Sequence, residues 1–398
     1  MSAVSNESTL FDARIEERQR QDRADTELAV CTLLTVSGMT TARARRLISA
    51  FSARDAYAAL CDGGPEVAAL FVDDNVTRRL SVAARDAAPI GAMYFDQCQR
   101  LGIGLWLPGD PGWERHFGSD TQAPAALFFL GDLLLCEKPR VAIVGTRSAT
   151  PAGREVAQRF GRELCDHGVA VVSGLAFGID ASAHAGSLAS SDPAPIGVVG
   201  SGLNVVYPRQ HGELWRRVST SGVLLSEYLP GVRPSERSFP ARNRIIAALA
   251  DVLVVVESTE SGGSMLTVHD AWSRAKPVMA VPGNPLNASC AGSNGLLRRG
   301  AATQHRVMAC IDTADILSVL ALDRLLTCSA VETRREPDAM GMVVLAELGW
   351  ESATTAKLVA RLARPMPEVV AALGTLEMDG WITCRQGQWS QVPTGVRR

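Results

Sequence analysis

Lysine is scarce in this 398-residue chain and occupies only positions 138, 276 and 357, although the chain has 40 basic residues. None of these lysines stands between a glycine and a serine or threonine, as the lysine of a phosphate-binding P-loop does. The sequence therefore excludes ATP hydrolysis of the P-loop type and leaves arginine to bind phosphate. A biased base composition of the gene would also explain the scarcity.

A large excess of either charge is also missing, because 42 acidic residues balance the 40 basic ones and the net charge is -2. This balance excludes a histone-like polybasic chain and an acidic disordered tail. It does not exclude a local basic site, because net charge averages over surfaces that never meet one ligand.

Paired cysteines and long hydrophobic runs are absent as well. The nine cysteines are scattered, with no C-x-x-C pair and no histidine at ligand spacing, which argues against a zinc site. Residues 1–26 are polar and charged, and no apolar stretch of membrane-spanning length is free of charges or turn residues. We therefore expect a reduced cytoplasmic protein that has no metal site and does not contact a membrane.

The chain divides by pattern into a flexible segment over 1–26, a helical domain over 27–88 and an alternating region over 92–318. In the helical domain, apolar residues at helical spacing flank a turn at Gly38. This arrangement resembles a SAM or helix-hairpin-helix unit, and a helical pair that only packs is an equally good interpretation.

The region 92–318 predicts a Rossmann-like domain. Short Val-rich runs bounded by glycine alternate with amphipathic stretches, which is typical of parallel strands buried on both faces. The expected fold is α/β, an extended Rossmann-like doubly wound parallel sheet with extra strands before the first βα unit. The expected strands are 141–145, 169–174, 196–202, 222–227, 251–258 and 276–283, and the expected helices are 151–166, 180–190, 209–220, 240–250 and 264–275.

The C-terminal part reads as a charged linker over 321–338 and a winged-helix domain over 339–396. Three helical stretches precede two short strands with a Gln386-Gly387 turn, which is the winged-helix order. This domain is nearly neutral, so we favour protein contacts over DNA binding there.

The loops that follow the predicted strands carry features that suit phosphate. After 141–145 the loop offers Arg147, and a helix begins with Thr150 as N-cap and Pro151 at its first position. Free amides at a helix N-terminus bind anions, and so does a guanidinium group. The next loop contains Gly174 and Gly178, where the backbone can approach a ligand closely. Gly-rich strand ends also occur for turn reasons alone.

The segment 232–247 is the most specific feature. It holds four arginines against one glutamate, a local charge of +3, with Phe239 among them. Bases can stack on an aromatic ring while arginines meet phosphates, which is what a single-stranded nucleic acid site needs. The alternative is that Phe239 packs in the core and that Arg242 or Arg244 forms structural ion pairs. A further strand end, at Gly262, Gly263 and Ser264, again offers amides before a helix.

No catalytic constellation emerges from the sequence. His184, His211 and His269 lie near loops, but none has a nucleophile partner at recognisable spacing. The pattern indicates a surface that binds polyanions, and we expect neither an enzyme nor a bound cofactor.

These motifs together resemble the DNA-processing protein DprA family, also called Smf. The resemblance runs over about residues 92–310 and rests on the following segments in order: VAIVGTR, SGLAFGIDASAH, GSGLNVVYP, LLSEY, FPARNRIIAAL, VVVES, GGSMLT, AVPG and GSNGLLRRGA. The helical and winged-helix regions agree with the fuller members of that family.

The resemblance implies a homodimeric protein that binds single-stranded DNA without sequence preference and loads the RecA recombinase in natural transformation and homologous recombination. It implies no enzymatic turnover. Phosphates would be captured by amides and arginines, and bases would stack on Phe239. Carried over by motif, the DNA-binding candidates are Arg147, Gly174, Phe177, Arg237, Phe239, Arg242, Asn243, Arg244, Gly262, Gly263 and Ser264.

Three features depart from the family pattern. Asn204 stands where the family has an aspartate, GGSMLTV stands where the family has an SGSLITA-type pattern, and Arg237 stands where a lysine is common before the Phe-Pro pair. Two other functions compete with the family reading. One is a Rossmann-like enzyme of the nucleoside-monophosphate phosphoribohydrolase type, for which only Asp270 could supply the carboxylate. The other is a structural winged-helix adaptor.

Overall fold

The computed structural model describes residues 4–71, 74–300, 307–321, 337–348, 353–362, 364–379, 381–385 and 388–391. The chain forms two compact units, residues 1–321 and 322–398. A membrane-spanning helix must be both long and apolar, and no helix within the described ranges is both.

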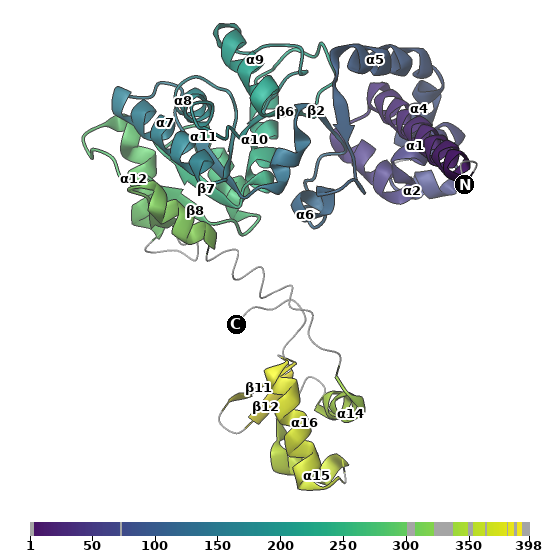
Figure 1. The fold of residues 1–398 in the computed structure, drawn as a ribbon, viewed down its shortest axis with the longest axis vertical. Helices are drawn as coiled ribbons and strands as arrows, with labels where there is room; N and C mark the ends of the chain where they lie inside the picture. The colour runs from purple at the N-terminus through teal and green to yellow at the C-terminus, as the bar shows by residue number, and fades with distance from the viewer. Residues whose placement is uncertain are drawn as a thin grey trace. The chain divides into compact units, whose positions relative to one another are not determined.

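The first unit begins with a group of helices (Figure 1). They are α1 (Val4–Thr35), α2 (Thr41–Asp62), α3 (Pro65–Ala69), α4 (Asp74–Arg85) and α5 (Ala88–Leu101). The predicted turn at Gly38 is present, with a φ of 83°, and Thr40 caps α2 by accepting a hydrogen bond from the Arg43 amide. Leu47 and Ile48 of α2 are buried against α1 as the spacing predicts.

The structure differs from the expected boundaries at both ends of this helical part. Helix α1 covers most of the stretch 1–26 that we expected to be a flexible segment, because helix-favouring residues there continue into the packed part of the helix. Arg23 fixes it further by pairing with Glu27 and Asp110. At the other end, α5 extends the helical part to Leu101, beyond the expected limit at 88, because it packs along α1.

A nine-stranded sheet forms the rest of the first unit, in the order β1-β2-β6-β5-β4-β3-β7-β8-β9. Strands β3 to β9 are parallel, and β1 and β2 add an antiparallel edge. The strands are β1 (Gly104–Trp106), β2 (Leu127–Gly131), β3 (Arg140–Val144), β4 (Ala170–Ser173), β5 (Pro195–Val198), β6 (Val223–Ser226), β7 (Val252–Val255), β8 (Val278–Ala280) and β9 (Val307–Ala309). The prediction of a Rossmann-like sheet preceded by extra strands is confirmed.

Helices connect the strands and cover the sheet (Figure 1). They are α6 (Trp113–Phe117), α7 (Pro151–Asp166), α8 (Ile179–Ser187), α9 (Gly212–Ser221), α10 (Ser238–Leu249), α11 (Ser264–Trp272) and α12 (Ala291–Gly300). The strand order reverses at β3, which has β4 on one side and β7 on the other. Ligands of such sheets bind beyond the carboxyl ends of the strands near this switch point.

The antiparallel edge joins the sheet to the helices before it. Alternate residues of β2 point to opposite faces, so Leu127 packs in the core of the parallel sheet while Phe128 packs with the N-terminal helices. Leu224 of β6 also belongs to this second core. The helical part and the sheet therefore share buried apolar surface.

The second unit has the predicted winged-helix order. It contains α14 (Ala339–Leu348), β10 (Ala353–Thr354), α15 (Thr355–Leu362), α16 (Met366–Met378), β11 (Ile382–Arg385) and β12 (Gln388–Gln391). The three strands pair in the order β10-β12-β11. Most of the predicted linker 321–338, and the Gln386-Gly387 turn, lie outside the described residues.

Candidate nucleic-acid interface

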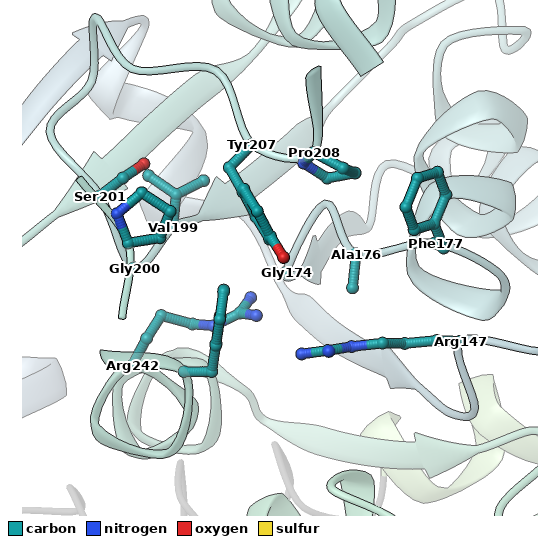
Figure 2. Close-up of a pocket in the computed structure, with 12 residues that line it drawn as sticks. Arg147, Gly174, Ala176, Phe177, Val199, Gly200, Ser201, Tyr207, Pro208 and Arg242 are labelled. Carbon is teal, nitrogen blue, oxygen red and sulfur yellow. The ribbon is translucent and has the colours of Figure 1, made fainter. Parts of the chain in front are cut away.

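A pocket opens at the carboxyl ends of the central strands, where loops after β3, β4 and β5 meet the start of α10. It encloses about 410 Å³ of empty space, part of it open to solvent. Five of the candidates chosen from sequence line it: Arg147, Gly174, Phe177, Phe239 and Arg242. Figure 2 shows the Arg147 and Arg242 side chains extending into this space from opposite sides, with the Tyr207 side chain pointing toward them from above.

Arg147 lies in the loop between β3 and α7 and is exposed. Thr150 caps α7 and Pro151 begins it, as the sequence predicts. The expected phosphate site on free amides of this helix is wrong, however, because a carboxylate of the chain already lies there. The Thr150 N–H donates to Glu257 Oε2 at 2.9 Å, and the Thr150 hydroxyl donates to Glu257 Oε1 at 2.5 Å. Of the two anion-binding features expected in this loop, the guanidinium of Arg147 is the one that faces the pocket.

The loop between β4 and α8 forms another wall. Gly174 is required by packing, because a Cβ there would overlap the Arg242 guanidinium, and its N–H donates to the buried Asp180 carboxylate at 3.2 Å. Gly178 has a φ of 77° and passes close to the Arg147 loop backbone. Phe177 lies between the two glycines, is 42% exposed and contacts His211 edge-on, with the ring centroids 4.7 Å apart. This loop therefore offers an aromatic ring to solvent at the pocket rim.

Phe239 is half-buried and contacts both Arg147 and Tyr207. The Arg147 guanidinium carbon lies 5.1 Å from the Phe239 ring centroid, a cation–π distance. The Tyr207 ring centroid is 5.3 Å from that of Phe239, with the planes tilted by 38°. Tyr207 itself is 43% exposed. Phe239 thus supports Arg147 and Tyr207, and the most exposed aromatic surface of the pocket belongs to Tyr207 and Phe177.

Arg242 is a buried cation at the floor of the pocket, with 5% of its surface exposed. One of its terminal nitrogens donates to the Val198 carbonyl at 2.7 Å, while its Nε has no hydrogen-bond partner among the described residues. Burial is the largest effect and lowers the pKa of Arg242, the Asp180 carboxylate opposes it, and Arg147 lowers the pKa further. Two guanidinium groups therefore share this pocket. The Asp180 carboxylate is the counter-charge that acts on Arg242. A bound anion would relieve the repulsion between the two arginines.

Asn243 and Arg244 follow on α10 but do not line the pocket. The Asn243 side-chain amide donates to the Gly263 carbonyl at 3.4 Å. Arg244 forms an ion pair of 2.6 Å with Glu227, whose side chain is 7% exposed, and donates to the Ala241 carbonyl. The structural ion pair that we considered as an alternative is therefore present at Arg244.

The remaining candidates lie at the starts of α10 and α11. Arg237 is exposed directly before α10. Gly263 is exposed, whereas the buried Ser264 donates its hydroxyl hydrogen bond to Ser258 at 2.8 Å. The Gly262 N–H donates to the Thr259 carbonyl, so this amide is used within the loop. The Asn243 contact links α10 to the loop between β7 and α11. Gly262, Gly263 and Ser264 do not line the pocket.

Sequence reasoning missed several residues of the site. The glycines of its loop do not point to Tyr207, although a tyrosine between a strand end and a proline is a signal that the sequence offers. Glu257 was missed because it reads as the polar end of a buried strand. Asn204, the departure from the family pattern, lies outside the pocket and accepts a hydrogen bond from the Gly231 amide at 2.6 Å.

Comparison with known proteins agrees with this architecture. Residues 105–315 match the family described as DNA recombination-mediator protein A, and residues 329–388 match the DprA winged helix domain. The chain belongs to the DprA family of DNA-processing proteins. The first match covers the whole sheet and pocket, so the residues described above lie in the part that defines the family.

Individual DprA relatives match over most of their length. A DNA processing protein DprA of Mycobacterium tuberculosis is 36% identical over 313 residues, which cover 75% of this chain and 79% of the relative. The protein Smf of Escherichia coli is 33% identical over 279 residues, covering 68% and 73%. The X-ray structure of DprA from Streptococcus pneumoniae has a TM-score of 0.61 and 27% identity, covering 72% of this chain and 95% of that one.

Proposed function

We propose that the pocket at the carboxyl edge of the sheet binds single-stranded DNA without sequence preference. The observation that carries this proposal is the convergence of Arg147 and Arg242 on one pocket whose rim exposes Phe177 and Tyr207. Guanidinium groups attract phosphates, and aromatic faces accept any base, which together give sequence-tolerant binding. Arg147 would contact the phosphates, and the buried Arg242 would keep the electrostatic potential at the bottom of the pocket positive.

A single strand suits this site better than a duplex. The Phe177 and Tyr207 rings can stack only on bases that are not already stacked within a helix. Phe239 is the residue that the sequence predicts to stack on a base. It stays a candidate for stacking, although it is half-buried and packs against Tyr207. The predicted contacts of Arg237, Asn243, Arg244 and Gly262 to Ser264 would extend the path of the strand along α10 to the start of α11, a path that the Asn243–Gly263 contact supports.

We infer the remaining cellular properties from family membership alone. The family's description as a recombination mediator supports loading of the RecA recombinase onto the bound strand. A homodimer and a cytoplasmic location follow from the same resemblance, as does action by binding rather than by enzymatic turnover. The winged-helix unit would serve protein contacts or DNA contacts.

Fluorescence anisotropy with a labelled oligo-dT at fixed salt tests the binding site. Arg147→Ala is expected to weaken binding about tenfold, because a charge-assisted hydrogen bond to phosphate is lost. The slope of log affinity against log salt should fall by about 0.7. Phe177→Ala is expected to weaken binding by about 1–3 kcal/mol for one stacked base.

A matched control is Arg216→Ala, which removes an exposed arginine on α9 that is paired with Glu213 and lies outside the pocket. It should leave the affinity and the salt slope unchanged. Equal affinity of wild type and Arg147→Ala, with unchanged melting curves, would contradict the proposed site. Release of free base from a nucleoside monophosphate would instead favour the phosphoribohydrolase-like enzyme, for which the half-buried Asp270 is already engaged by Arg274.

A further inference from the structure

The loop that presents Arg147, residues 145–150, is hydrogen-bonded at both ends to one glutamate that follows the neighbouring strand. Glu257 follows β7 and holds this loop at both of its ends. Its backbone carbonyl accepts the Thr146 N–H at 2.7 Å, and its carboxylate accepts the Thr150 N–H and hydroxyl at 2.9 and 2.5 Å. Arg147 lies between these two anchored residues.

The Glu257 side chain is buried and does not lie on the surface. It is 6% exposed, and Gly153 in the first turn of α7 makes room for it, because a Cβ there would overlap the carboxylate. The Thr150 hydroxyl that donates to Glu257 also accepts the Gly153 N–H at 3.0 Å. A negative charge at a helix N-terminus is favourable, so the helix itself stabilises the ionised carboxylate.

This position is the place beside the switch point where Rossmann-like sheets receive a ligand phosphate. Here the chain fills it with its own anion. A ligand phosphate would meet the Glu257 charge at this helix and is directed instead to the exposed guanidinium of Arg147, which faces the pocket.

We infer that Glu257 is a positioning residue for DNA binding: its backbone carbonyl and its two side-chain oxygens anchor the Arg147 loop at both ends and keep Arg147 directed toward the pocket and the phosphates of the strand. The inference rests on the proposed function of the pocket. It assigns to Glu257 a role that works through Arg147, without contact to DNA.

Two substitutions separate positioning from charge. Glu257→Ala removes both carboxylate oxygens at Thr150 and leaves the backbone bond to Thr146, and it should weaken oligo-dT binding about tenfold and lower the salt slope by about 0.7, as Arg147→Ala does. Glu257→Gln keeps an oxygen that can accept the Thr150 N–H and an amide that can donate to the Thr150 hydroxyl. It should therefore hold the loop and retain binding within about twofold.

Asp251→Ala is the matched control, because Asp251 is the carboxylate at the opposite ends of the same two strands, where it pairs with Arg140. It should lower the melting temperature yet keep the wild-type salt slope in the folded protein. If Glu257→Ala does not fold, Thr150→Val removes the hydroxyl contacts to Glu257 and to the Gly153 N–H but keeps the bond from the Thr150 N–H to Glu257, and it should weaken binding about threefold.

A double variant decides whether Glu257 acts through Arg147. Glu257→Ala should have no further effect on affinity in an Arg147→Ala background, because the two act as one unit. Additive losses would overturn the inference, and so would a wild-type salt slope in folded Glu257→Ala. If Arg147→Ala itself leaves binding unchanged, the proposed function fails and the inference falls with it; if only Arg147→Ala weakens binding, the inference alone fails.

Discussion

The two ends of strands β3 and β7 use an arginine and a carboxylate in opposite ways. At the amino ends, Arg140 is 1% exposed and all its donor groups meet the chain: Asp251 and three backbone carbonyls. At the carboxyl ends, the Glu257 carboxylate accepts hydrogen bonds from Thr150, and the exposed Arg147 guanidinium lies over the Phe239 ring. The fold supplies hydrogen-bond acceptors for the guanidinium group of Arg140, whereas that of Arg147 is exposed at the pocket.

We expect the largest loss of stability from a substitution of Arg140, whose guanidinium nitrogens all donate hydrogen bonds within the chain. Arg140→Met removes the ion-pair partner of Asp251 but keeps the hydrogen bond from the backbone N–H of residue 140, and it should lower the free energy of unfolding of the first unit by about 3–5 kcal/mol. Chemical denaturation measures this loss. Affinity for oligo-dT should be unchanged below the melting temperature, and a matching loss of affinity would show that the two ends are not independent.

Arg244 on α10 tests whether an arginine of that helix stabilises the fold or contacts DNA. Arg244→Met leaves Glu227 buried and unpaired, so we expect a loss of about 3 kcal/mol in the free energy of unfolding. Burial already raises the pKa of Glu227, so the variant should recover part of this loss at acidic pH by protonating the carboxyl group. Denaturation at pH 8 and pH 5 measures the difference. Weaker DNA binding with unchanged stability would place Arg244 with Arg147 instead.

His184 makes the carboxyl-end region sensitive to acid. Burial lowers the pKa of His184 to about 4, from an ordinary value near 6.5, and Arg242 adds to the effect. The unfolded chain therefore binds the proton more readily, so stability should fall as pH drops from about 6.5 toward 4, by roughly 2–3 kcal/mol. Melting curves over this range measure the loss. His184→Gln should reduce the dependence without removing it, because burial also lowers the pKa of His116, to about 3. An unchanged dependence would show that other groups cause it.

Arg237 should show the smallest effect. It is exposed before α10 and lies outside the pocket lining, so Arg237→Ala removes at most one screened phosphate contact. The salt slope should fall by no more than about 0.7, and affinity by about threefold or less. A loss equal to that of Arg147→Ala would move the centre of the site from the pocket toward α10.

The sequence predicts most of the sheet and half of the site. Val-rich runs bounded by glycine mark strands whatever their neighbours, and the motifs that hold Arg147 and Phe239 become specific through their order along the chain. Pairings between distant residues are not visible in the same way. Nothing local shows that Glu257 will fill the start of α7 or that Arg244 will meet Glu227, because both contacts depend on which strands become neighbours.

The fold carries a further consequence at the antiparallel edge. Phe128 and Leu224 face the N-terminal helices, so the sheet has one apolar face that its own crossover helices do not cover alone. A fragment cut off before β2 would expose that face to water and invite aggregation. Recombinant fragments of this protein should therefore be cut between residues 321 and 337, where one compact unit gives way to the next along the chain, rather than near residue 100.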